Sequence, residues 1–126
     1  QAAWILERFH DWSDRRERAF EAVFSREELL DNIMIYVMTG AFHSSIRFYA
    51  AAMEGGYRSL PEGARVEVPT AFACFPDPLH PWAPRGFAEK GFNVSRYTPM
   101  PRGGHFAALE APDLLVADLR EWGRTG

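Results

Sequence analysis

The sequence predicts an α/β fold in which helices cover a parallel sheet. Its second half reads as strand, loop, helix, strand, loop and helix, an alternation that is typical of parallel strands. One strand is expected over 66–75: residues 66–68 lead into it, and the short apolar run 70–75, bounded by prolines, has the pattern of burial on both faces. A second strand is expected over 92–98. Ligands in such folds bind beyond the carboxyl ends of the strands, so a site is expected in loops 76–83 and 99–105.

A first helix is expected over residues 2–13, because apolar side chains recur there near helical spacing. The mixed-sign charges that follow, in residues 14–24, are typical of a solvated surface connection. We therefore expect Asp14 and its charged neighbours, Glu17 among them, to face water.

A capping box predicts where the next helix begins. Ser25 and Glu28 have the Ser-x-x-Glu spacing directly before an apolar run, and the helix should stop at 39–40. A further helix is expected over 42–53 and should end at the Gly55-Gly56 pair, which opens a loop rich in glycine and proline.

Prolines predict where the elements of the second half of the chain begin and end. Four prolines fall within residues 76–84, so no helix or strand can continue through this segment and a loop is expected there. A short helix is expected over 84–90, between the two strands. Pro112 suits the first position of a last amphipathic helix, because its missing N–H has no partner there in any case.

Composition limits the classes of function. The chain has 126 residues, of which 47% are hydrophobic and 25% charged, as in a globular domain. A net charge of −3 without a basic cluster argues against nucleic-acid binding, and no apolar run approaches the ~18 residues of a membrane span. The single cysteine, Cys74, excludes an internal disulfide, and its apolar neighbours predict a buried thiol in a cytoplasmic protein. Because the chain begins with Gln-Ala-Ala-Trp, we expect it to be a piece of a longer protein.

His105 is the candidate general base. Two glycines precede it in Arg-Gly-Gly-His, where they allow a tight turn that presents the imidazole at the end of a strand. A histidine there can take up a proton near neutral pH. The spacing alone leaves a purely structural role open as well.

Asp77 follows the first strand in Phe-Pro-Asp-Pro, so it can meet His105 at the same edge of the sheet. Its carboxylate would accept the ring N–H, fix the tautomer and stabilise the imidazolium. The same aspartate can instead cap a turn beside Pro78. Spacing does not decide between these two roles.

Tyr49 and His80 carry weaker indications. Tyr49 can donate a hydrogen bond to an oxygen that gains charge, but its helical spacing favours an aromatic core residue. His80 lies near Asp77 and allows only a weak metal site, because none of the four histidines forms a His-x-x-x-His or HExxH pattern. We expect neither a metal nor a cofactor.

Several segments resemble one family. The segments VPTAFACFPDP (68–78) and NVSRYTPMPRGGHFAALEAPDLLVADLREW (93–122) resemble the C-terminal part of the microsomal-type epoxide hydrolases, in the α/β-hydrolase superfamily. ELLDNIMIYVMTGAFHSSIRFYAAA resembles the segment in which that family's lid returns to the core. The resemblance implies a C-terminal fragment of an α/β-hydrolase fold, with its last two parallel strands. Residues 1–24 would be the end of the helical lid and residues 25–126 part of the core.

The resemblance also implies a mechanism. In that family an aspartate opens the epoxide and forms an ester, and a histidine oriented by an acid then activates water. His105 matches this histidine, and Tyr49 matches the tyrosine that donates to the epoxide oxygen. Asp77 is the best match to the acid, although Pro78 stands where the family usually places it, and Val37 stands where a Trp is common. No residue of this sequence matches the nucleophile, so we expect the chain alone to be inactive.

The expected partners are a small-molecule epoxide and water, which react to a vicinal diol; a homo-oligomer is left open. A detoxifying hydrolase fits this chemistry. One alternative is another α/β hydrolase, an esterase or a haloalkane dehalogenase, that uses the same histidine and acid. Tyr49 distinguishes an epoxide hydrolase from a haloalkane dehalogenase, because epoxide opening needs its hydroxyl and dehalogenation does not. The other alternative is a non-catalytic remnant or interaction module.

Overall fold

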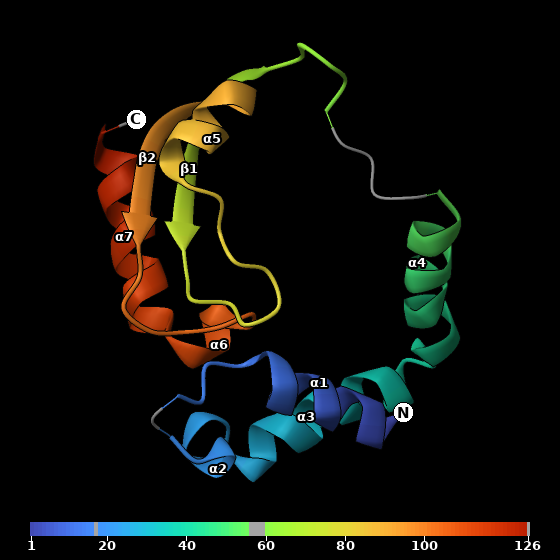
Figure 1. Ribbon diagram of the computed structural model, residues 1–126. Helices are drawn as coiled ribbons and strands as arrows, with labels where there is room; N and C mark the ends of the chain where they lie inside the picture. Colours follow the sequence, from blue (N-terminus) through green and yellow to red (C-terminus); the bar gives the residue numbers. More distant parts are fainter. Residues whose placement is uncertain (17, 56–59, 126) are drawn as a thin grey trace.

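The structure, a computed structural model, describes residues 1–16, 18–55 and 60–125. Its elements are α1 (Ala2–Trp12), α2 (Phe20–Val23), α3 (Arg26–Met38), α4 (Phe42–Gly55), β1 (Val66–Cys74), α5 (Arg85–Gly91), β2 (Phe92–Pro99), α6 (Ala107–Glu110) and α7 (Pro112–Thr125). Figure 1 shows α1, α2 and α3 beyond the carboxyl ends of both strands, with α7 alongside the sheet. The expectations for Glu17 and Gly56 lie outside the described residues.

The two strands pair in parallel, as predicted. Phe72 lies opposite Tyr97, and Cys74 lies opposite Pro99, so both strands end at one edge of the sheet. The prediction that residues 70–75 are buried on both faces holds only for Cys74 and Phe75, and residues 70–73 are half-buried. The reason is that the described sheet has two strands, so much of its surface has no covering element.

Polar side chains attach α7 to β2. The carboxylate of Asp118, which is buried, accepts hydrogen bonds from Arg96 Nε at 2.7 Å and from Thr98 Oγ1 at 2.8 Å. The indole N–H of Trp122 donates to Ser95 Oγ at 3.1 Å. A buried carboxylate is stable only when its oxygens have partners, so these bonds also fix how α7 lies against the strand.

The predicted helices are confirmed with shifts of one or two residues at their ends. The capping box is present: Ser25 Oγ accepts from the Glu28 N–H, and the Glu28 side chain accepts from the Ser25 N–H. Pro112 opens the last helix as predicted. The short helices α2 and α6 were not predicted, because single turns leave little periodicity in a sequence.

The main apolar cluster lies among the first three helices and extends to the second half of the chain. Its buried members are Ile5, Phe9, Phe24, Leu29 and Ile33. Phe106, which follows His105, stacks on Phe9 with ring centroids 4.2 Å apart and planes 8° apart. The histidine loop therefore shares its packing with α1.

The segment after α1 is only in part the solvated connection that its charges predicted, since Arg16 and Glu21 are exposed but other residues are not. Ser13 and Asp14 are buried, and Phe24 is 2% exposed. The charge pattern misleads here because Asp14 finds buried partners in the distant loop before α6, as described below.

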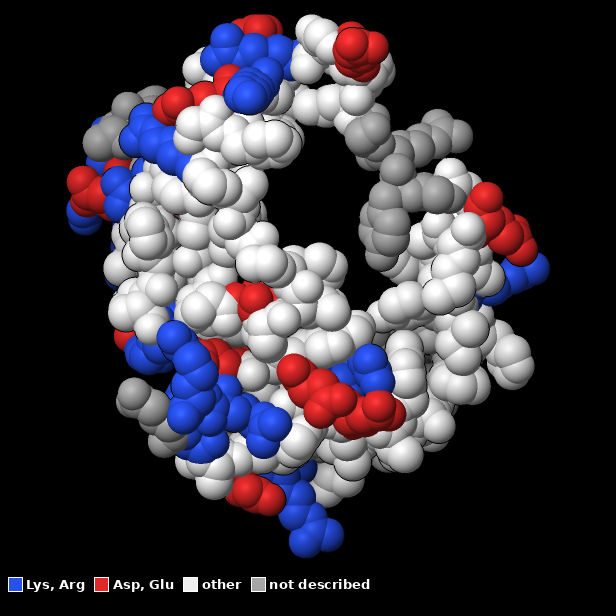
Figure 2. All heavy atoms as spheres, in the orientation of Figure 1, with Lys and Arg blue, Asp and Glu red and all other residues white. Residues whose placement is uncertain are grey.

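Charged side chains gather on the outer surface in Figure 2. Figure 1 shows α4 standing apart from the sheet, and Figure 2 shows an opening between them whose described walls are mostly uncharged. Among the described residues, none of the helices has both the length and the apolar character needed to cross a bilayer.

Candidate functional site

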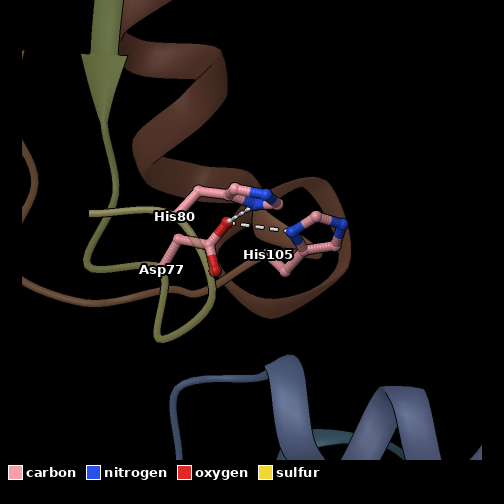
Figure 3. A group of neighbouring side chains, drawn as sticks. All are labelled: Asp77, His80 and His105. Carbon is pink, nitrogen blue, oxygen red and sulfur yellow. Dashed lines mark hydrogen bonds and ion pairs between the residues drawn. The ribbon is translucent and has the colours of Figure 1, made fainter. Parts of the chain in front are cut away.

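His105 and Asp77 meet beyond the carboxyl ends of β2 and β1 (Figure 3). Nδ1 of His105 lies 2.9 Å from Oδ2 of Asp77, a hydrogen-bond distance. A carboxylate can only accept, so with Asp77 ionised the proton is on Nδ1 and Nε2 is left with a free lone pair. The Asp77 side chain is 12% exposed and the His105 side chain 31%, so the imidazole is the more accessible partner. This arrangement can remove a proton from a water molecule or from another nucleophile.

The carboxylate of Asp77 makes both of the contacts that its sequence context left open. While Oδ2 faces His105, Oδ1 accepts the backbone N–H of Leu79 at 2.8 Å and so caps the turn at Pro78. Burial alone would raise the pKa of Asp77, but the hydrogen bonds from His105 and from the N–H groups of Leu79 and His80 outweigh it and lower the pKa. The carboxylate is therefore ionised at neutral pH.

His80 is the third polar side chain at this place. Its Nδ1 lies 3.7 Å from Oδ2 of Asp77, and its ring centroid lies 5.8 Å from that of His105 (Figure 3). The ligand atoms of these three residues lie within 4.8 Å of one another, so the weak metal site that the sequence allows at His80 has a geometric basis, although no metal was expected. Two imidazoles and a carboxylate suit an ion such as Zn²⁺. Ligation through Oδ2 would compete with the hydrogen bond to His105.

Tyr49 is not next to this pair. Its ring packs edge-on against Trp4 with centroids 5.6 Å apart, and the residue is 40% exposed, so it is not the core residue that its spacing favoured. Tyr49, Trp4 and Trp12 line an open hollow of about 530 Å³. The ring of Trp12 also packs edge-to-face with the ring of His105, and the two ring centroids lie 4.9 Å apart. Trp12 thus lies between the hollow and the histidine.

Trp12 is the site residue that sequence reasoning missed. Besides the ring contact, its carbonyl accepts the backbone N–H of His105 at 3.0 Å. Helical periodicity gives Trp12 only an apolar position on α1, and nothing in the sequence connects residue 12 with residue 105. The contact comes from how α1 packs on the loop.

The structure requires glycine at each of the two positions before His105, for different reasons. Gly103 has φ of +99°, in the left-handed region, which glycine adopts without strain. Gly104 allows a close backbone approach, because a Cβ there would lie 2.8 Å from the carbonyl oxygen of Trp12. The tight turn that the sequence predicted is therefore confirmed.

Parallel strands that end in an aspartate–histidine pair define an α/β chain with a site for activating water or a nucleophile. No protein-family model matches the chain. It is 40% identical over 124 residues to epoxide hydrolase 1 of Oryctolagus cuniculus and 39% identical over 127 residues to epoxide hydrolase 1 of Sus scrofa. It is also 40% identical over 124 residues to juvenile hormone epoxide hydrolase 2 of Ctenocephalides felis.

These matches include 94 to 96% of this chain but only 27 to 28% of each relative. The resemblance to epoxide hydrolases is confirmed, and the chain is a homologue of about a quarter of such a protein. Its helices and parallel strand pair are compatible with the C-terminal part of an α/β hydrolase.

Proposed function

We propose that this chain is the water-activating part of an epoxide hydrolase, which converts an epoxide to a vicinal diol through an ester on an aspartate outside this sequence. The observation that carries the proposal is the 2.9 Å bond between His105 and Asp77, in a chain whose relatives are named epoxide hydrolases. In the same proposal, residues 1–24 end the lid and residues 25–126 belong to the core.

The proposed role of His105 is to deprotonate water. Nε2 takes a proton while the water oxygen attacks the carbonyl carbon of the ester, and the Asp77 carboxylate stabilises the imidazolium that forms. When the acyl–oxygen bond breaks, the imidazolium returns the proton to the leaving alkoxide. The products are the diol and the carboxylic acid of the nucleophile, and His105 is again neutral. The acid then gives up its proton, which balances the proton that the epoxide oxygen took up when the ring opened, and the carboxylate is restored.

The proposed role of Tyr49 belongs to the earlier step. Its hydroxyl would donate a hydrogen bond to the epoxide oxygen, which gains negative charge as the ring opens. In support, Tyr49 lines the hollow beside Trp4 and Trp12, whose apolar rings suit a hydrophobic epoxide. A substrate in that hollow would reach past Trp12 towards His105.

The nucleophile of the proposal is not one of the acids that surround the histidine loop. Asp14 and Glu110 are the buried carboxylates beside it, and both already accept backbone hydrogen bonds. Asp77 is engaged with His105 and with Leu79. We therefore expect this chain, assayed alone with an epoxide, to show no turnover.

The decisive experiment uses the complete reading frame, expressed at the length of its relatives, and mixes it with a styrene oxide-type substrate. His105→Gln should form the ester but release it slowly, so intact-mass spectrometry should find the protein heavier by one substrate. His10→Gln is a matched control, because His10 also has an aspartate at 2.8 Å, Asp11, on the exposed side of α1. Normal turnover by His105→Gln, or a variant without any ester, would overturn the proposal.

A further inference from the structure

Two buried carboxylates flank the loop that carries His105, and the proposed reaction uses neither of them. Asp14 is 7% exposed and Glu110 is 4% exposed. Asp14 follows α1, and Glu110 ends α6, so they approach the loop from distant parts of the sequence. Burying a carboxylate is costly unless its oxygens accept hydrogen bonds. The hydrogen-bond donors to Asp14 and Glu110 therefore show which parts of the loop these carboxylates fix.

Glu110 uses both of its oxygens on backbone N–H groups. Oε1 accepts from Phe106 at 2.9 Å, and Oε2 accepts from Asp14 at 2.7 Å. One side chain therefore connects the residue after His105 with the segment that follows α1. A carboxylate is the side chain that can accept at both positions, because an amide has a single oxygen.

Asp14 binds the other end of the loop. Its Oδ2 accepts the Gly103 N–H at 3.0 Å, and its carboxylate pairs with Arg16, whose Nε lies 2.8 Å from Oδ1. Arg16 also donates to the carbonyl of Pro101 at 3.2 Å. The hydrogen bonds from Arg16 and, to a smaller extent, from the Gly103 N–H together lower the pKa of Asp14 to about 2 against the opposing effect of burial.

Between these two attachments, the N–H of His105 itself donates to the carbonyl of Trp12 at 3.0 Å. The N–H groups of Gly103, His105 and Phe106 are thus all bonded by the end of α1 or by Glu110. The backbone on both sides of His105 is therefore fixed by contacts that do not involve Asp77.

We propose that Asp14 and Glu110 form a carboxylate clamp of two positioning residues, which fixes the 103–106 backbone so that Nδ1 of His105 faces Asp77. The inference rests on the proposed function for calling this histidine the water-activating group. The clamp acts through the loop and does not touch substrate. It makes the orientation of the base depend on a segment 89 to 96 residues away in sequence.

The clamp is tested in the complete protein, without any substrate, by ¹⁵N-resolved NMR of the histidine rings. The measured quantities are the tautomer of His105 and the rate at which its Nδ1–H exchanges with water. Glu110→Gln keeps one side-chain oxygen as an acceptor and loses the other. Asp14→Ala loses the acceptor for the Gly103 N–H and the ion-pair partner of Arg16. Each should speed exchange of the Nδ1–H at least tenfold and shift the ring towards the Nε2–H tautomer.

Two further variants separate positioning from general loss of stability. Asp14→Asn keeps an acceptor oxygen for Gly103, so it should speed exchange less than Asp14→Ala. Asp118→Asn removes the charge of an equally buried carboxylate that binds Arg96 and Thr98 on β2, away from the loop, and should leave the His105 ring signals unchanged.

A folded Glu110→Gln or Asp14→Ala chain with unchanged Nδ1–H exchange would overturn the clamp, and so would an equal effect in Asp118→Asn. If Asp14→Ala does not fold, the comparison of Asp14→Asn with Asp118→Asn decides in the same way. Because no epoxide is involved, these results are independent of the assay for the proposed function. A failed epoxide assay would leave the clamp standing, and unchanged exchange would leave the hydrolase proposal standing.

Discussion

A Cβ atom on Gly104 would lie 2.6 Å from the backbone nitrogen of Asp14. Carbon and nitrogen atoms that are not bonded do not approach so closely, and a backbone atom cannot swing aside as a flexible side chain can. The histidine loop and the end of α1 are therefore in direct backbone contact at this point. Only a residue without a side chain fits there.

Gly104→Ala should destabilise the chain by roughly 1–3 kcal/mol, because the new methyl group has no space among backbone atoms. Gly55→Ala is the control: it lies in α4, and a Cβ there meets nothing within 4 Å. That change should be neutral or stabilise by up to about 1 kcal/mol. Urea unfolding followed by far-UV circular dichroism measures both, and equal losses at the two glycines would contradict the contact.

Asp77→Asn should slow hydrolysis of the ester far more than its formation. An amide at this position no longer stabilises the imidazolium, and it can turn its NH₂ towards Nδ1 and so favour the wrong tautomer. A loss of roughly 10²–10⁴-fold in the rate of ester decay is expected in the complete protein. Rapid-quench mass spectrometry follows that decay. Asp113→Asn, whose carboxylate binds Arg102 at the surface, should decay at the normal rate.

The stability of the chain should fall between about pH 4 and pH 2 through Asp14. Its pKa is about 2 in the folded chain and 3.8 ordinarily, so the unfolded chain binds the proton more readily. The stabilisation is complete above pH 4 and is lost as the pH falls to 2, and it amounts to roughly 2 kcal/mol. Urea unfolding at several pH values measures it. Asp14→Asn should lack this part of the pH dependence, and identical slopes in both proteins would contradict it.

The thiol of Cys74 should react slowly with iodoacetamide while the chain is folded. Burial raises the pKa of Cys74 more than the hydrogen bond with Tyr97 lowers it, and the nearby charge of Asp118 raises it too. The thiolate is the reactive form, so less of it is present at pH 8 than for a free cysteine. Mass spectrometry should find the native chain largely unlabelled and the urea-unfolded chain labelled, and fast native labelling would contradict the burial of this thiol.

Tyr49→Phe should slow epoxide opening tenfold or more in the complete protein, because the hydroxyl that would donate to the epoxide oxygen is gone. The rate of ester formation in a single turnover measures this step. Tyr36→Phe is the matched control, since Tyr36 lines a smaller hollow together with Tyr49 but is not among the residues that line the 530 Å³ hollow proposed for the substrate. An unchanged rate in Tyr49→Phe, or activity towards a haloalkane in place of an epoxide, would favour the other class of hydrolase.

Local signals in the sequence predicted most of the elements. The Ser25–Glu28 box, Pro112 and the prolines of 76–84 act within a few residues, so their effects can be read without knowing the fold. The pairing of Asp77 with His105 was also predictable in outline. It follows from the rule that neighbouring parallel strands end at one edge of the sheet.

The environment of the site was not predictable in the same way. Asp14 sits in a charged run that is typical of a solvated surface, yet its burial depends on Glu110, 96 residues further along the chain. Trp12 is one apolar position among several on α1, and its contact with His105 needs the packed structure. One sequence carries no signal for contacts of this range, because they depend on how whole elements dock.

His105 follows Asp77 by 28 positions, and the chain between them runs through one helix and one strand, so a single parallel crossover brings the acid and the base to the same edge of the sheet. The acid and the base therefore tolerate insertions elsewhere in a longer polypeptide, provided that the end of α1 still reaches the histidine loop. Under the proposed function, different nucleophiles outside this sequence could be combined with the same acid and base. The reaction could then diversify by exchange of the attacking group.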